Sequence, residues 1–172
     1  MIAPSMSSPS EPIRERESAP VRVRYQTLPD DIRHPNLNRL YRHWDEVRRG
    51  REMPSRADFD PLSLPELLGN LILIDVLHDP LRFRYRLIGS WLTERIKRDM
   101  TGKFFDEVPE PIYRERLYEW HGGCVAERIP RAGFTARRLL ERWEPYEILT
   151  LPLSSSGADV DMTLTGIYYR AP

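Results

Sequence analysis

The sequence predicts an α+β domain in which helices cover one face of an antiparallel sheet. Three observations indicate this class: an amphipathic helical pattern, a strand hairpin that follows it, and strand-like text after Pro130. Helical segments set between antiparallel hairpins are typical of α+β domains. At 172 residues the chain fits one domain and can bury a substantial core.

The first segment, residues 1–33, predicts a flexible tail. It is rich in Ser, Pro, Glu and Arg and poor in large apolar side chains, so it cannot bury enough surface to offset its ordering entropy. Val21–Tyr25 alternates like a short strand, but we assign it to the tail. A single domain is predicted over residues 34–170.

Residues 34–50 predict a flanking amphipathic helix that ends at Gly50, a residue typical of helix C-terminal caps. Its apolar side chains share one face: Leu37, Leu40, Tyr41, Trp44 and Val47. We assign this face to a homodimer or partner contact, made together with the outer face of the sheet. The alternative is that it packs on the chain's own sheet.

Asn70–Gly89 predicts two strands that flank a turn at His78-Asp79-Pro80. The first strand is apolar on both faces and should be covered on both sides. The second alternates, so Phe83, Tyr85 and Leu87 should point one way and the arginines the other. The row of Arg82, Arg84 and Arg86 faces water or carboxylates in the simplest interpretation.

Two other interpretations of the arginine row stay open. It could meet an acidic partner surface or the glutamates of the tail, Glu11, Glu15 and Glu17. Alternatively, Arg86 could reach the rim of a cavity and hold a carboxylate.

Short helices follow Ser90, and a helix is predicted from about Ile112 to Val125, weakened in the middle by Gly122 and Gly123. Three strands then close the domain. Large side chains should converge between sheet and helices, either as plain core or as the lining of a ligand pocket. The predicted pocket residues are Tyr85, Leu87, Trp91, Phe104, Phe105, Trp120, His121, Cys124, Phe134, Leu149 and Leu151, with Arg86 at the rim.

Composition and motifs exclude several function classes. Lys+Arg and Asp+Glu both number 26, so the basic excess typical of nucleic-acid binders is missing. Cys124 is the single cysteine, which excludes an intramolecular disulfide. No apolar run reaches the length of a membrane span, and the N-terminus does not read as a signal peptide. We therefore expect a cytoplasmic protein that binds neither membrane nor nucleic acid.

No catalytic motif or metal-ligand spacing is visible, so we expect no enzyme activity and assign no catalytic or metal-binding residue. The element order and five stretches of text resemble the PAS superfamily, and specifically a PAS-like family found mainly in alphaproteobacteria. The stretches are Met53–Pro61, Asn70–Val76, Arg82–Ser90, Asp99–Val108 and Leu151–Tyr169. The resemblance implies a five-stranded antiparallel sheet with helices on one face and a small cavity between them.

The resemblance also implies a sensory or regulatory module rather than an enzyme. Flavin photosensors of this fold carry an Asn-Cys-Arg motif, which Cys124 in "HGGCVAER" does not match. Haem-binding members use a histidine on the cavity helix, which leaves His121 as a haem alternative; no cofactor is required.

We thus predict a stand-alone PAS-like signalling module, a homodimer that acts through a small apolar or carboxylated ligand, a protein partner, or both. The alternatives are a pure adaptor with a filled core and a small-molecule enzyme that uses His121 with a nearby carboxylate.

Overall fold

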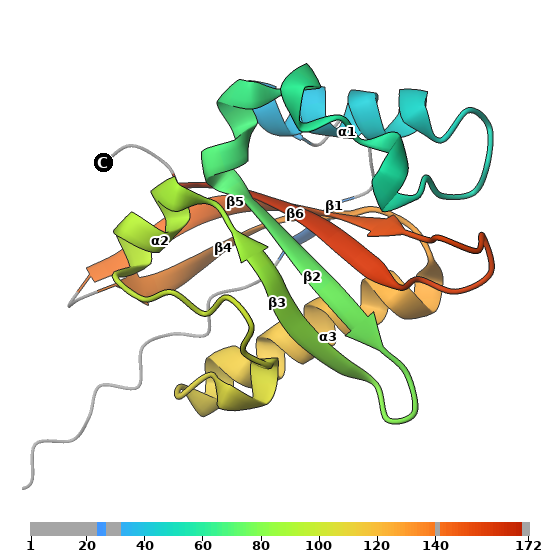
Figure 1. Cartoon of the computed structure of the whole chain (residues 1–172). Helices are drawn as coiled ribbons and strands as arrows, with labels where there is room; N and C mark the ends of the chain where they lie inside the picture. The colour runs from blue at the N-terminus through green and yellow to red at the C-terminus, as the bar shows by residue number, and fades with distance from the viewer. Residues whose placement is uncertain (1–23, 27–31, 140–141, 170–172) are drawn as a thin grey trace, which may run out of the picture.

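A computed structural model describes residues 24–26, 32–139 and 142–169 of the chain. Its centre is an antiparallel sheet with five long strands and one short strand in the order β1-β4-β5-β6-β2-β3 (Figure 1). The strands are β1 (Arg24–Gln26), β2 (Leu71–Leu77), β3 (Arg82–Ile88), β4 (Arg131–Leu139), β5 (Arg142–Leu153) and β6 (Met162–Tyr169). The predicted α+β class and the five antiparallel strands are confirmed.

Helices lie on both sides of this sheet. They are α1 (Pro35–Val47), α2 (Ser90–Ile96) and α3 (Pro111–Glu127), with short 3-10 helices η1 (Arg56–Asp58), η2 (Pro61–Ser63), η3 (Pro65–Asn70) and η4 (Phe105–Glu107). Figure 1 shows α1 and α3 on opposite faces, which we call the α1 face and the α3 face. As expected for a strand covered on both sides, β2 is buried from Leu71 to Val76.

The apolar side of α1 packs on the chain's own sheet. Leu37, Leu40 and Trp44 are buried, and the Trp44 indole Nε1 donates a hydrogen bond to the Pro152 carbonyl at 2.9 Å. Gly166 makes the close approach possible, because a Cβ there would lie 2.6 Å from the Leu37 Cδ2. The assignment of these three side chains to a dimer contact is therefore wrong, since the protomer itself covers them; only Tyr41 and Val47 stay partly exposed.

A β-bulge breaks the predicted alternation of β3. Leu73 pairs with Leu87 and Ile74 pairs with Tyr85, so Arg86 is an extra residue in the ladder. A bulge of this kind reverses the face of the residues that follow it. Tyr85 consequently points to the α3 face and is 6% exposed, whereas Leu87 lies on the α1 face and is 52% exposed.

Most of the predicted tail, residues 1–23 and 27–31, lies outside the described residues. Within it, Arg24–Gln26 forms β1 and pairs with β4 in the register Arg24–Phe134 to Gln26–Ala132. Of the alternating segment Val21–Tyr25, the structure describes Arg24 and Tyr25, and both lie in β1. The residues just before α1 are fixed to the sheet. Ile32 is buried, and the Glu147 carboxylate on β5 accepts the backbone N–H groups of Arg33 and His34 at 2.7 and 3.0 Å.

Candidate functional site

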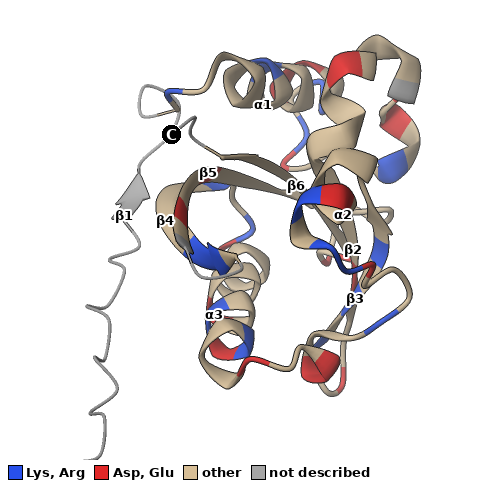
Figure 2. Ribbon diagram, turned by 90° about the vertical axis from the view of Figure 1, so that its left-hand side faces the viewer, with Lys and Arg blue, Asp and Glu red and all other residues tan. Residues whose placement is uncertain are grey.

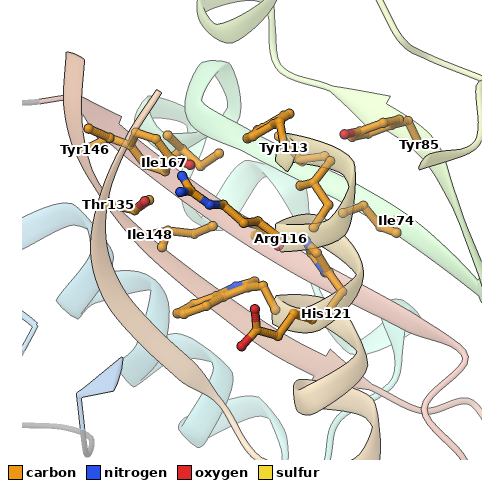
Figure 3. Close-up of a pocket in the computed structure, with 15 residues that line it drawn as sticks. Ile74, Tyr85, Tyr113, Arg116, His121, Thr135, Tyr146, Ile148 and Ile167 are labelled. Atoms are coloured by element: carbon orange, nitrogen blue, oxygen red, sulfur yellow. The ribbon is translucent and has the colours of Figure 1, made fainter. Parts of the chain in front are cut away.

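A cavity of about 60 Å³ lies between the α3 face of the sheet and α3 itself. We call it the inner cavity; Figure 3 shows its lining. It is walled by Ile72, Ile74, Tyr85, Tyr113, Arg116, Leu117, Glu119, Trp120, His121, Thr135, Ala136, Tyr146, Ile148, Thr165 and Ile167. Because a single water needs about 10–15 Å³, the space suits a few waters or a very small organic molecule.

A second lobe of about 30 Å³ adjoins the inner cavity and shares Tyr85 and Tyr113 with it. Arg137 lines this lobe, and its guanidinium carbon lies 4.2 Å from the centre of the Tyr113 ring. Burial raises the pKa of Tyr85 and of Tyr146 well above the ordinary value. Both phenols therefore stay protonated at neutral pH and can donate hydrogen bonds into the cavity.

Arg116 is the most distinctive polar group of the inner cavity. Figure 3 shows its side chain reaching from α3 toward Thr135 on β4. It forms no hydrogen bond or ion pair with any residue that the structure describes. An arginine held beside apolar walls without a partner can bind an anion with charge-assisted hydrogen bonds.

Sequence reasoning missed Arg116, although a signal was present. Tyr113, Arg116 and Trp120 are spaced three and four residues apart, which places them on one side of a helix. All three line the inner cavity. The charge of Arg116 hides this face, because an arginine does not contribute to an apolar pattern.

Of the predicted pocket residues, Tyr85, Trp120 and His121 do line the inner cavity. Phe105 and Cys124 are fully buried beside it without lining it. The Phe105 ring centre lies 4.9 Å from that of Tyr85. The Cys124 thiol donates to the Ile129 carbonyl, and burial raises its pKa to about 12. Cys124 is therefore a packed thiol rather than a nucleophile.

Three predicted pocket residues lie on the wrong face of the sheet. Leu149 pairs with Gly166 and Leu151 pairs with Leu164, so both point to the α1 face, where they are fully buried. Phe134 also lies on that face, with the Arg33 guanidinium 5.4 Å from its ring centre. Strand β5 carries apolar residues on both faces, so alternation alone could not assign them.

Three more predicted pocket residues lie away from the inner cavity. Leu87 is displaced to the α1 face by the bulge, and Trp91 is 39% exposed beside Tyr169. Phe104 is half-buried under the Arg82 guanidinium, whose carbon lies 3.9 Å from its ring centre. None of them lines either lobe.

The arginine row meets carboxylates within the chain. Arg84 and Arg86 share Asp75, with N–O distances of 2.8 and 3.1 Å, and Arg82 pairs with Asp106 at 2.7 Å. The prediction that Arg86 forms the cavity rim is wrong, because Arg86 lies on the α1 face with Asp75. The tail glutamates lie outside the described residues. Figure 2 shows that both charge signs are interspersed over the described chain.

The inner cavity does not fit a haem. An engineered cavity of about 150 Å³ holds a single benzene, and this cavity is smaller than that. The Nδ1 atom of His121 is 3.2 Å from the Thr163 hydroxyl, not beside a carboxylate as the enzyme alternative required. Within the described ranges no group of three or more His, Cys, Asp or Glu side chains could hold a metal ion.

His121 should make the fold sensitive to acid. Burial and, to a smaller extent, Arg131 lower its pKa from 6.5 to about 3. Between about pH 6.5 and pH 3, His121 is therefore protonated in the unfolded chain but neutral in the folded chain. The contribution of His121 to the free energy of unfolding is fully present above pH 6.5 and decreases as the pH falls toward 3. We expect a slope near 1.4 kcal/mol per pH unit inside this window. Urea unfolding at a series of pH values should show it for the native chain.

The control is His121→Gln, which should unfold with a shallower pH dependence over the same window. An unchanged slope would mean that other groups cause the acid sensitivity.

No helix among the residues that the structure describes is long and apolar enough to cross a membrane. Homodimerisation remains a prediction, and it needs a surface other than the buried side of α1.

Comparisons with known proteins agree with this architecture. The sequence model of the PAS domain family matches residues 32–169. Among solved structures, the PAS domain of BvgS from Bordetella pertussis is similar in fold, with a TM-score of 0.50 and 19% sequence identity. That match covers 66% of this chain and 89% of the BvgS domain. The search of curated proteins gave no match. The chain belongs to the PAS domain family, a family of sensory and signalling modules.

Proposed function

We propose that this protein is a sensory module that binds a small carboxylate in the inner cavity and passes the signal on by binding a protein partner or a second copy. The observation that carries the proposal is the Arg116 guanidinium, which lines a mainly apolar cavity and has no partner in the described part of the chain. Isoleucines of three strands would hold the apolar part of the ligand: Ile72, Ile74, Ile148 and Ile167.

The cavity volume limits the size of this ligand. A space of about 60 Å³ beside a lobe of about 30 Å³ favours a carboxylate of a few carbon atoms. The phenol groups of Tyr85 and Tyr146 are protonated and support binding of an anion, because they can donate hydrogen bonds without adding negative charge. A ligand would act as a signal only if it bound one of two packings of the chain more tightly.

Replacement of Arg116 by glutamine tests this proposal. We expect butyrate to bind the native protein and to shift the NMR signals of the isoleucine δ1 methyl groups that line the cavity. Arg116→Gln should raise the dissociation constant for butyrate roughly tenfold or more, because a hydrogen bond to a charged group contributes about 1.5–3 kcal/mol. The measurement is an NMR titration of the isoleucine-labelled protein.

Two controls sharpen the test. Arg138→Gln changes an exposed arginine on β4 and should leave butyrate binding unchanged. Butan-1-ol, which lacks the carboxylate, should bind the native protein and Arg116→Gln equally. If butyrate binds both variants equally, Arg116 is not the anion site. If neither compound shifts a methyl signal, the adaptor alternative with a filled core is favoured instead.

Native mass spectrometry of the protein purified without added ligand identifies a natural ligand. A reproducible small-molecule adduct of acidic character would support the sensor proposal and give the mass of its ligand.

A further inference from the structure

A larger cavity lies on the other face of the sheet, between α1, the segment from η1 to η3, and strands β2, β3 and β6. Its volume is about 240 Å³, against about 60 Å³ for the inner cavity. We call it the outer pocket. Its walls are mostly apolar and include Leu40, Phe59, Leu73, Leu87 and Leu164. The exposed fraction of Leu87, 52%, shows that this apolar lining is open to solvent.

His43 on α1 also lines the outer pocket and is its unusual member. Its ring packs edge-on against Phe59, with 5.4 Å between ring centres. The Nε2 atom is buried but has no hydrogen-bond partner among the described residues. A buried polar atom without a hydrogen bond costs free energy, so a ligand group that reached Nε2 from the outer pocket and completed the bond would remove that cost.

The two charged groups at the outer pocket are occupied by the chain's own backbone. Arg56 donates to the Phe59 carbonyl at 3.0 Å, and the Asp60 carboxylate accepts the backbone N–H of Leu62 at 2.9 Å. Their opposite charges also offset each other for an incoming molecule. A carboxylate would be attracted by Arg56 and repelled by Asp60, so net charge gives no advantage here.

We propose that the outer pocket is a second ligand site, which takes a neutral small molecule with an apolar body and one hydroxyl group. The hydroxyl completes the hydrogen bond of His43 Nε2, and it can do so with either tautomer because a hydroxyl both donates and accepts. The volume admits a molecule larger than benzene, for which an engineered apolar cavity of about 150 Å³ suffices.

The composition of the walls allows the two sites to be told apart in one experiment. Leucines of α1 and of three strands line the outer pocket, and isoleucines line the inner cavity. No isoleucine lines the outer pocket within the described ranges. We would titrate the full chain, labelled at leucine and isoleucine methyl groups, with 4-ethylphenol. The expected result is a shift of the Leu73, Leu87 and Leu164 signals while Ile148 and Ile167 stay in place.

His43→Phe tests the hydrogen bond, because it keeps the ring against Phe59 and removes the nitrogen. In the native protein 4-ethylphenol should bind about fivefold more tightly than ethylbenzene, the value expected for one neutral hydrogen bond. In His43→Phe this preference should disappear, whereas ethylbenzene should bind both proteins. Arg116→Gln is the control for the inner cavity and should leave binding of 4-ethylphenol unchanged.

Three results would overturn the proposal. Shifts confined to the isoleucines would place 4-ethylphenol in the inner cavity. An unchanged preference for the phenol in His43→Phe would show that Nε2 does not bind the hydroxyl. The third result combines two observations: the native chain does not bind 4-ethylphenol, and Leu87→Glu has a smaller mass than the native chain in sedimentation velocity. Together they would assign the outer pocket to a contact between two copies. None of these results would contradict carboxylate binding at Arg116.

Discussion

Replacing Gly89 by alanine is expected to lower the free energy of unfolding by about 3 kcal/mol or more, the upper end of the overpacking range. Gly89 lies between β3 and α2, and its backbone N–H donates to the Leu71 carbonyl at 2.8 Å. A Cβ at this position would lie 2.4 Å from the carbonyl oxygens of Leu68 and Gly69. These atoms belong to backbone and cannot rotate away. Urea unfolding of the native and variant chains measures the difference.

Gly122→Ala is the matched control for Gly89→Ala. Gly122 lies in the middle of α3, and a Cβ there would meet nothing within 4 Å. The same substitution should therefore raise stability by about 0.8–1 kcal/mol, the difference in helix propensity between glycine and alanine. Equal effects at the two positions would mean that the close approach of η3 to Gly89 is not tight in solution.

Trp44→Ala is expected to destabilise the isolated protomer by about 3–5 kcal/mol, as is typical when a buried tryptophan is truncated. Trp44 is 4% exposed and loses both its packing on the sheet and its hydrogen bond to Pro152. For a chain of this length the melting temperature should fall by roughly 10 °C or more. Thermal unfolding followed by circular dichroism, at protein concentrations spanning a hundredfold, would measure it.

The concentration series separates the two interpretations of α1. Destabilisation that is independent of concentration places Trp44 in the protomer core, as the structure indicates. Destabilisation only at high concentration, with a loss of assembled mass, would restore the dimer contact. Trp143→Ala is the control, because this tryptophan is 44% exposed and its truncation should cost little.

The hairpins and helix order could be predicted from the sequence because each is encoded locally. Leu71–Leu77 and Arg82–Ile88 flank an Asp-Pro turn, and the last hairpin closes around a Gly-containing loop at Gly157. The helix α3 also runs unbroken through Gly122 and Gly123, since its packing on the sheet outweighs the low helix propensity of glycine.

The site was predicted less well, because its membership depends on which face each strand presents. One extra residue in the ladder, Arg86, places Leu87 on the α1 face instead of the α3 face of Tyr85. The sequence contains no turn residue at this point that would predict a bulge. Leu149 and Ile148 are equally apolar neighbours on β5, yet they face opposite layers. Which of the two residues faces α1 and which faces α3 depends on how these helices pack on the sheet, and that packing results from contacts distant in sequence.

Strand β2 separates the inner cavity from the outer pocket, so a ligand in one can affect binding in the other. Ile72 and Ile74 face the inner cavity, and Leu71 and Leu73, their neighbours in the chain, face the outer pocket. If a ligand in one cavity displaces β2 and so changes the affinity of the other cavity for its ligand, thermodynamic reciprocity requires the reverse effect to have the same factor. A substitution that shifts the β2 backbone would disturb both cavities at once, whereas His43 on α1 and Arg116 on α3 each line one cavity alone.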